Sequence, residues 1–440
     1  MTAPRSLLLR LYRGASPALA NLVGQLAPFS PKLAAGVQGR QGLDARLAEA
    51  APRLRGGVWF HVTSVGEYEQ ARPVIAAIKE AHPEMPVAVT HFSPSGYHYA
   101  LRRPCADFHD YLPFDHPDPM DRLLRLWRPR LLVFVKFDLW PNQVLAAHRQ
   151  GVPLVLLAGS LAPTSGRLHP MVRGMYRDLF DRFAHLGVCT PDDARRFRED
   201  LGVSCPLSVT GDTRVEQVIL RYEASRDGDT ATRLKSLGGR ILVLGSTWPP
   251  DERLWMPILP TLLADFPDLR VVLTPHEPLE ERLVKLEAEL TRQGVSHVRL
   301  SALAGKTNDS KHAILEHAIP ERVILVDSIG KLAEIYRSGH LAYVGGSFTT
   351  GVHNTMEPAV ASLPVFFGPR IQNAEEALLL VQRRAGFVLQ KPDEALDQAR
   401  RLLAAEDLRL DTGDAARRVV LEQRGATARS MRVIAPYLED

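Results

Sequence analysis

Short apolar runs alternate with segments of helical spacing along most of the chain. In the first half they stand at Val58–Val62, Pro86–Thr90, Leu131–Val135, Val152–Leu157 and Leu207–Thr210. After residue 240 they return at Ile241–Leu244, Leu269–Leu273, Val323–Val326, Leu341–Val344 and Pro364–Phe367. Apolar strands separated by helices are typical of parallel sheets with helices on both faces. The pattern predicts an α/β fold with two doubly wound, Rossmann-type sheets.

The length agrees with two domains, because 440 residues exceed what one hydrophobic core usually serves. A charged, polar stretch at Val215–Arg240 interrupts the strand pattern. We therefore predict an N-terminal domain over residues 37–215 and a C-terminal domain over 216–440, closed by a helical tail at Pro392–Leu438. Ligands of doubly wound sheets bind at the carboxyl ends of the strands. We expect these ends of both sheets to face one cleft.

The first 36 residues are apolar but carry charge. Arg10 and Arg13 interrupt the leucines and Pro17 breaks the run, so the segment is too short and too charged to span a bilayer. An amphipathic helix in a membrane interface fits this composition. The alternative is a helix that packs on the first domain.

Composition and charge narrow the function classes. The chain is 45% hydrophobic and 24% charged, as in ordinary globular proteins, and its net charge is +4. No basic run with interleaved aromatic residues appears, so nucleic acid is not an expected partner. Cys105, Cys189 and Cys205 lack metal-ligand spacing and predict reduced thiols. No Gly-x-Gly-x-x-Gly follows the first strand and no P-loop is present, which argues against dehydrogenases and NTPases.

Polar residues follow several strands of the first half. Glu67 stands in the turn behind the first strand, where it could act as a general base or be a helix-start acid stabilised by the helix macrodipole. Lys136 and Asp138 follow the later strand Leu131–Val135. They could take part in a reaction, or they could form a salt-bridged strand end beside a core tryptophan. Arg214 lies in the turn that ends the first half of the chain. Its side chain could bind a phosphate, or it could be a solvated linker residue.

The second half carries polar or small residues after four successive strands. Loops at one sheet edge can converge on one nucleotide. These segments are Gly245-Ser246-Thr247-Trp248, Pro275-His276-Glu277, Asp327-Ser328-Ile329-Gly330, and the turn with Gly345, Gly346 and Gly351.

The last of these loops leads into a helix expected to begin near Asn354. A glycine-rich turn before a helix N-terminus is a common anion site. Asn354 and Glu357 would lie on its first turn and face one opening. The same spacing also describes a capping box, which merely ends the helix.

Together these motifs, in order, resemble the 3-deoxy-D-manno-octulosonic acid (Kdo) transferases of lipopolysaccharide synthesis. The likeness extends over nearly the whole chain. The motifs are Ser64-Val65-Gly66-Glu67, Ser93-Pro94-Ser95-Gly96, Asp138-Leu139-Trp140-Pro141-Asn142, Gly211-Asp212-Thr213-Arg214, Ser246-Thr247, Gly345-Gly346-Ser347, His353-Asn354-Thr355-Met356-Glu357-Pro358 and Phe367-Gly368-Pro369.

The resemblance implies a two-domain GT-B fold and inverting transfer of Kdo from CMP-Kdo to a lipid A precursor, without a metal or other cofactor. It implies a peripheral enzyme at the cytoplasmic face of the bacterial inner membrane. Glu67 aligns with the general base, and Lys136 and Arg214 align with residues that stabilise the transition state. The residues aligned with CMP contacts are Pro275, His276, Ile329, Gly330, Lys331, Asn354, Thr355, Met356 and Glu357. Further donor or acceptor contacts are expected at Ser64, Gly66, Ser246, Thr247, Gly346 and Ser347.

The chain departs from the family pattern at three places. Lys136 replaces the first acid of a Glu-Thr-Glu-Leu-Trp-Pro run, Arg214 replaces a lysine, and Pro275–Pro278 reads Pro-His-Glu-Pro instead of Pro-Arg-His-Pro. Lys136 reverses the local charge, whereas Arg214 preserves it. Two alternatives remain: another GT-B nucleotide-sugar enzyme, such as a lipid-disaccharide synthase or sugar epimerase, and a membrane-surface binding protein without turnover.

Overall fold

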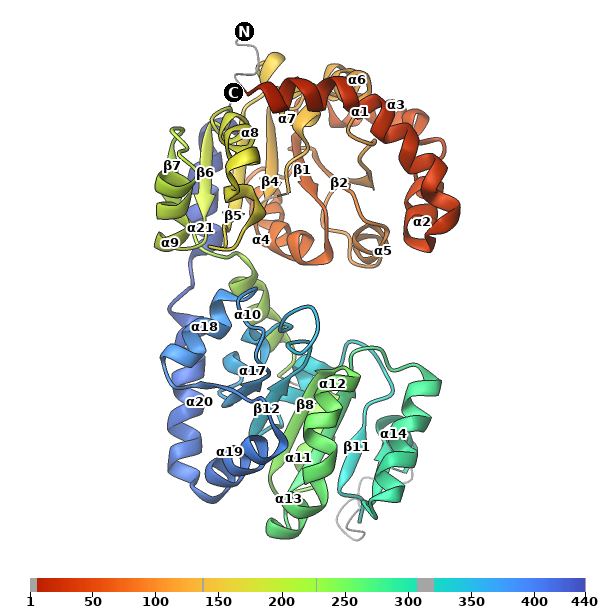
Figure 1. Ribbon diagram of the computed structural model, residues 1–440, viewed down its shortest axis with the longest axis vertical. Coiled ribbons are helices and arrows are strands. Elements are labelled where there is room, and N and C mark those ends of the chain that lie inside the picture. Colours follow the sequence, from red (N-terminus) through yellow and green to blue (C-terminus); the bar gives the residue numbers. More distant parts are fainter. Residues whose placement is uncertain (1–5, 137, 227, 307–319, 440) are drawn as a thin grey trace. The chain divides into compact units, whose positions relative to one another are not determined.

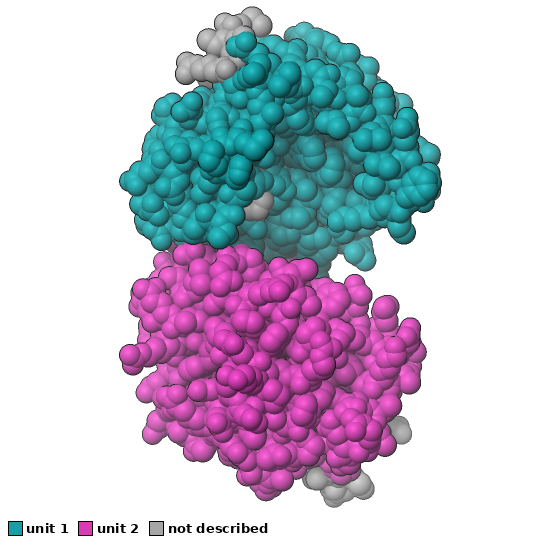
Figure 2. Space-filling model, viewed as in Figure 1, with its two compact units in different colours: residues 1–217, 425–440 teal, residues 218–424 magenta. Residues whose placement is uncertain are grey.

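The computed structural model describes residues 6–136, 138–226, 228–306 and 320–439. They form two compact units, residues 1–217 with 425–440 and residues 218–424 (Figure 2). The strand pattern predicts residues 425–440 as part of the second domain. The structure instead packs α21 (Ala426–Ile434) against α4 (Val65–Ala81) of the first unit, where the Ile434 side chain is fully buried.

The first unit contains a seven-stranded parallel sheet in the order β3-β2-β1-β4-β5-β6-β7 (Figure 1). Strand order reverses between β1 and β4, which makes this a doubly wound sheet with its switch point at that pair. The strands are β1 (Val58–Val62), β2 (Val87–His91), β3 (Phe108–Tyr111), β4 (Leu131–Val135), β5 (Leu154–Gly159), β6 (His185–Val188) and β7 (Leu207–Val209).

The second unit repeats this architecture with the order β10-β11-β9-β8-β12-β13-β14. Its switch point lies between β8 and β12. The strands are β8 (Ile241–Thr247), β9 (Arg270–Pro275), β10 (His297–Arg299), β11 (Val323–Leu325), β12 (Leu341–Val344), β13 (Val365–Phe367) and β14 (Gly386–Val388). The predicted fold class of two doubly wound parallel sheets is confirmed.

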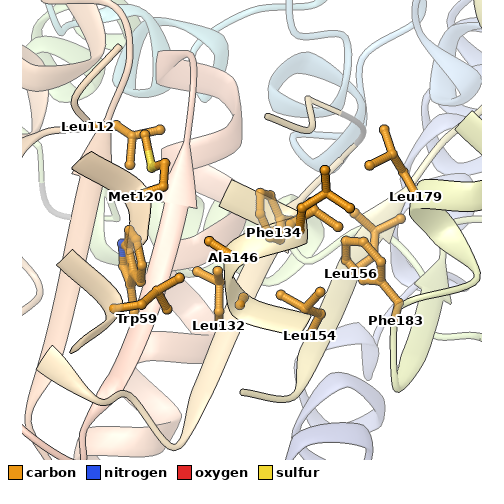
Figure 3. Packing of buried hydrophobic residues seen from close by; sticks show 14 of the residues in the cluster. Trp59, Leu112, Met120, Leu132, Phe134, Ala146, Leu154, Leu156, Leu179 and Phe183 are labelled. Carbon is orange, nitrogen blue, oxygen red and sulfur yellow. The ribbon is translucent and has the colours of Figure 1, made fainter. Parts of the chain in front are cut away.

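Helices cover both faces of the first sheet, so its central strands are buried throughout and read as continuous apolar runs. Successive side chains of each strand point to opposite faces: Trp59 and Leu132 pack on one side, and Phe60 and Val133 on the other. Figure 3 shows the first of these two clusters. The covering helices of the unit are α1 (Leu7–Leu26), α2 (Pro31–Gly39), α3 (Leu43–Leu54), α4, α5 (Pro94–Arg102), α6 (Pro117–Trp127), α7 (Pro141–Arg149), α8 (Pro170–Phe180), α9 (Pro191–Arg195) and α21.

The second sheet is covered in the same way. Leu242 and Leu244 of β8 join one cluster, while Ile241 and Val243 join the opposite one. Its helices are α11 (Asp229–Ser236), α12 (Pro249–Trp255), α13 (Leu259–Asp265), α14 (Glu280–Arg292), α15 (Leu300–Lys306), α16 (Leu332–Tyr336), α17 (Met356–Val360), α18 (Glu375–Gln382), α19 (Pro392–Ala404) and α20 (Glu406–Leu421). Helix α10 (Arg214–Ala224) runs from the first unit into the second. The stretch Val215–Arg240 is therefore largely helical.

Helix α1 is attached to the first unit through a few contacts. Leu9 is fully buried, the Tyr12 hydroxyl donates to Asp115 Oδ2 at 2.9 Å, and Asn142 Nδ2 donates to Ser16 Oγ at 2.9 Å. Over the described part of the chain, no helix has the length and apolar character needed to cross a membrane.

The opposite face of α1 and the segment after it expose large apolar side chains. They are Leu7, Leu8, Leu11, Leu19, Leu22, Leu26, Phe29 and Leu33. The predicted amphipathic helix is thus formed, and it both packs on the first unit and leaves a leucine-rich face uncovered.

Candidate functional site

Glu67 lies beside the switch point of the first sheet. It is the third residue of α4, directly after β1, and α4 begins with a capping box. The Glu67 amide donates to Ser64 Oγ, and the Glu67 carboxylate accepts the amides of Thr63 and Ser64 through Oε2. Glu67 is therefore a helix-start acid, as one of its two interpretations predicts, and in addition it caps α4. Among the residues that the structure describes, no hydrogen bond reaches the other oxygen, Oε1.

The surroundings of Glu67 favour proton uptake near neutral pH. The side chain is buried, and this desolvation, together with the charge of Asp138, raises its pKa to about 7. The amides of Thr63 and Ser64 and the charge of Lys136 oppose the rise. The helix cap is thus also a carboxyl group whose pKa suits a general base.

Lys136 and Asp138 flank the same switch point from the end of β4. Lys136 has the left-handed φ of 71°, uncommon for a non-glycine residue, and its amide donates to Leu157 O at 2.8 Å. Asp138 forms an ion pair with Arg167 at 3.1 Å. The salt-bridged strand end is therefore present, and it faces Glu67. Phe137, between the two, lies outside the described residues.

Arg214 is held by Asp212. Its Nε and Nη2 donate to Asp212 Oδ2 at 2.8 and 2.6 Å, so it is not a solvated linker residue. Burial raises the pKa of Asp212, but Arg214 and Gln70 outweigh it and hold that pKa below its usual value. Gln70, one turn after Glu67 on α4, donates to Asp212 Oδ1 at 3.0 Å. Helix α4 thus links Glu67 to the Arg214 loop.

The two other predicted contact residues of this edge, Ser64 and Gly66, lie at the start of α4. Ser64 is the N-cap, and Gly66 is the second helical residue, where an added Cβ would meet only Ser64 Oγ at 3.9 Å. Lys136 and Arg214 both act electrostatically on the thiol of the half-buried Cys189, directly after β6. The structure therefore brings Glu67, Lys136 and Arg214 to one edge of one sheet.

At the second sheet, Ser246 and Thr247 end β8 beside the switch point. Ser246 has a left-handed φ of 52°. The Thr247 hydroxyl donates to Glu252, which also pairs with Arg282 at 2.6 Å. Thr247 is thus a buried support of this edge, and its carbonyl accepts the His276 amide at 2.9 Å.

The glycine-rich turn after β12 is fixed by Asp251. The fully buried Asp251 carboxylate accepts the Tyr343 hydroxyl at 2.6 Å and the amides of Gly346 and Trp248 at 3.0 and 2.8 Å. Ser347, also buried, accepts the Gly368 amide at 2.6 Å through Oγ. The sequence pattern places Asp251 at the start of a helix, behind two prolines, but it did not predict that this acid holds the glycine turn.

The helix after this turn differs from the expectation. Helix α17 starts at Met356, Thr355 is its N-cap, and the Asn354 side chain accepts the Met356 amide at 3.0 Å. Glu357 pairs with Arg221 at 3.7 Å. The predicted Asn354–Glu357 capping box is therefore wrong. With only five residues, α17 also has too few aligned peptide dipoles to attract an anion strongly, so the side chains must supply most of the attraction.

The other predicted CMP contacts occupy the same sheet edge. Pro275 ends β9 and His276 follows it with an exposed side chain. The Thr355 and Met356 side chains are buried, which leaves only their backbone for a ligand.

Ile329, Gly330 and Lys331 form the turn that leads from β11 into α16. Gly330 has a φ of +87°, Ile329 is 85% exposed, and Lys331 lies 3.9 Å from Glu334. Within the described ranges, no group of three or more His, Cys, Asp or Glu side chains is arranged to hold a metal ion.

Comparisons with known proteins point to one family. The family model of the 3-deoxy-D-manno-octulosonic-acid transferases (kdotransferases) matches residues 37–217. The curated 3-deoxy-D-manno-octulosonic acid transferase of Chlamydophila psittaci is 30% identical, over 76% of this chain and 74% of its own length. The enzyme of the same name from Haemophilus influenzae is 26% identical over 96% of each chain.

Among solved structures, the fold is similar to that of UDP-GlcNAc 2-epimerase from Neisseria meningitidis, with a TM-score of 0.58 and 12% identity. The match covers 87% of this chain and 99% of that one. At this identity the likeness concerns the fold alone, which is the GT-B-like pair of doubly wound sheets.

Proposed function

Because the chain belongs to the 3-deoxy-D-manno-octulosonic acid transferase family of glycosyltransferases, we propose that it transfers Kdo from CMP-Kdo to a lipid A precursor with inversion at the anomeric carbon. Glu67 is the general base. The partners of the protein are a nucleotide-sugar donor and a lipid acceptor at the cytoplasmic face of the bacterial inner membrane.

The buried carboxyl group of Glu67 is the observation that carries this proposal. Its pKa of about 7 allows it to take a proton at neutral pH. Oε2 is occupied by two backbone amides, so Oε1 accepts the proton of the acceptor hydroxyl. The hydroxyl oxygen attacks the anomeric carbon, the bond from that carbon to the CMP phosphate breaks, and the phosphate leaves with the electron pair.

Lys136 and Arg214 supply the positive charge of the first sheet edge. Lys136 stabilises the Glu67 carboxylate that the reaction needs. Asp212 fixes the orientation of the Arg214 guanidinium, which we assign to the charge that develops on the leaving phosphate. Fixed charges and dipoles of this kind can do the work of a cation.

The donor contacts are assigned to the edge of the second sheet. The CMP group meets Pro275 and His276 after β9, the turn of Ile329 to Lys331 after β11, and Asn354 to Glu357 at α17. Glu357, oriented by Arg221, accepts from a ribose hydroxyl. Ser246, Thr247, Gly346 and Ser347 shape the same edge, mainly through backbone and buried hydrogen bonds.

The leucine-rich face of α1 is assigned to the membrane. Its side chains would enter the lipid interface, while Arg10 and Arg13 on the same helix meet lipid phosphates. A lipid acceptor is presented from that surface, so a peripheral attachment suits the reaction.

A transfer assay tests the proposal. CMP-Kdo is generated in situ, a tetra-acylated lipid A precursor is the acceptor, and the lipid products are weighed by mass spectrometry. Glu67→Gln keeps a side chain that can accept the capping amides but removes the base. We expect a loss of about 10²- to 10⁴-fold in turnover, with the affinity for CMP nearly unchanged.

Glu69→Gln is the matched control, because this buried acid lies on the same helix and pairs with Arg72 and Tyr99. It should retain turnover. Full activity of Glu67→Gln would remove Glu67 as the base. Absence of product from the wild type with CMP still bound would reject the lipid acceptor and leave the donor.

A further inference from the structure

At the switch point of the second sheet, the His276 ring stacks on two other aromatic rings, those of Trp248 and His353. The Trp248 and His276 ring centroids lie 4.8 Å apart, and those of His276 and His353 lie 4.4 Å apart with an angle of only 7° between their planes. Trp248 follows β8, His276 follows β9 and His353 lies in the turn after β12. The rings thus come from three different strand ends and meet at the position where doubly wound sheets bind ligands.

A hydrogen bond fixes the tautomer of His353. The Trp248 Nε1–H group donates to His353 Nε2 at 2.9 Å. An indole nitrogen can only donate, so His353 Nε2 must accept and cannot carry a proton. A neutral imidazole with an accepting Nε2 carries its hydrogen on Nδ1.

The close packing of Gly346 sets the direction of the ring. A Cβ added to Gly346 would lie 2.7 and 2.8 Å from His353 Cδ2 and Nε2. That edge of the imidazole therefore faces the glycine turn and Trp248, and Nδ1 lies on the opposite edge. Nδ1 has no hydrogen-bond partner among the residues that the structure describes.

The surroundings keep His353 neutral. Burial and the adjacent His276 lower its pKa to about 4, and burial also lowers the pKa of His276. The charged groups nearby are Glu277, beside His276, and Asp251, whose carboxylate is bound to Gly346 and Trp248 behind the turn. A second positive charge on two rings 4.4 Å apart would be repelled, so neither ring supplies a cation.

We propose that His353 binds the donor nucleotide as a neutral hydrogen-bond donor, with Nδ1–H directed at an anionic oxygen of its phosphate and Trp248 setting the tautomer. The inference rests on the proposed CMP donor. His276 stands where the family carries an arginine, so the attraction of that arginine for the donor phosphate is lost. The Nδ1–H dipole of His353 would replace part of this attraction.

The first test observes the tautomer directly. Long-range proton–nitrogen NMR of the full-length protein, with His353→Asn used to assign the signal, should show a neutral ring protonated at Nδ1 from pH 6 to 8. A proton on Nε2, or a charged ring at pH 6.5, would overturn the proposal.

The second test measures CMP affinity by calorimetry at pH 5.5 to 8 in wild type and Trp248→Phe. Phenylalanine keeps an aromatic ring but cannot donate, so His353 regains both tautomers and a pKa nearer its usual value. At pH 8 the variant should bind CMP several-fold more weakly. The deficit should shrink as the pH falls and His353 becomes charged, and comparison with wild type cancels the titration of the CMP phosphate itself.

Trp255→Phe is the matched control, since Trp255 is a buried core residue of the same unit. It should change stability without changing the pH dependence of CMP binding. A pH-independent deficit in Trp248→Phe would show a merely structural role and reject the proposal.

Replacement of His353 gives a third, independent measurement. Asparagine places a donor near the former Nδ1, whereas alanine removes it. His353→Ala should weaken CMP binding about tenfold to hundredfold, as for a hydrogen bond to a charged group, and His353→Asn should recover part of the loss. Equal losses in both would contradict the donor role. If wild type does not bind CMP at all, the proposed donor fails instead.

Discussion

The two sheet edges have the same topology and opposite chemistry. Beside the first switch point stand charged side chains: Glu67, Lys136, Asp138 and the Asp212–Arg214 pair. Beside the second switch point stand stacked neutral rings and a glycine turn, and the Asp251 carboxylate that fixes this turn is fully buried. An edge of coupled charges can set the pKa of a base, whereas flat rings and bare backbone suit a nucleotide. The residues at the strand ends, rather than the fold, decide what each edge can do.

The two edges share one backbone feature. Lys136 at the end of β4 and Ser246 at the end of β8 both have left-handed φ angles, 71° and 52°. This conformation is costly for residues with a Cβ and persists where the surroundings enforce it. Each edge therefore contains a strained backbone position, but only at the first edge does the strained residue, Lys136, carry a charged side chain.

At the second edge, the glycine turn provides the largest expected effect on CMP binding. Gly346 has a φ of +96°, and a Cβ there would lie 2.6 Å from Gly351 O as well as against His353. Gly346→Ala should displace the turn and weaken CMP binding by about a hundredfold, that is, by about 2.7 kcal/mol. Calorimetry measures this loss.

Gly294→Ala serves as the control for Gly346→Ala. Gly294 also has a positive φ, +69°, but an added Cβ meets nothing within 4 Å. It should lower the melting temperature through strain alone and leave CMP affinity intact. Equal affinity losses in both variants would assign the effect to strain and not to the shape of the site.

Two substitutions of opposite charge test whether the first edge sets the pKa of Glu67. The base works as a carboxylate, so kcat/KM should rise with pH through the Glu67 pKa of about 7. Lys136→Met removes a cation that lowers this pKa, so the rising limb should move to higher pH. Asp138→Asn removes an anion that raises it, so the limb should move to lower pH. We expect shifts of about one pH unit.

Glu69→Gln should leave the position of this limb unchanged. Shifts of Lys136→Met and Asp138→Asn in the same direction would show that the limb does not report Glu67. In that case the titrating group would have to be sought in the substrates or elsewhere in the first unit.

The smallest effect is expected on helix α1, outside both edges. Leu11 is 60% exposed on its leucine-rich face. Leu11→Gln should weaken binding to anionic phospholipid vesicles by about threefold to tenfold, because one leucine loses part of its transfer energy. Vesicle sedimentation measures it. The similarly exposed Leu410 on α20 is the control, and an equal loss in Leu410→Gln would contradict a membrane role specific to α1.

Much of the fold was predictable because parallel strands covered on both faces leave continuous apolar runs. The strands at Val58–Val62, Leu131–Val135 and Leu341–Val344 were predicted with their observed bounds. Four short strands were missed: β3, β6, β10 and β14. The polar positions of β3 and the three-residue lengths of β10 and β14 give little apolar signal.

The sequence by itself determined the two sheets, the family resemblance and the residue types at each strand end. Only the tertiary structure decided that α21 returns to the first unit, that Gln70 of α4 donates to Asp212, and that Glu357 pairs with Arg221 instead of capping α17. It also decided that Trp248, His276 and His353 stack. The physical reason is distance along the chain: apolar periodicity is local, whereas desolvation, ion pairing and ring stacking depend on residues that only the folded sheet brings together.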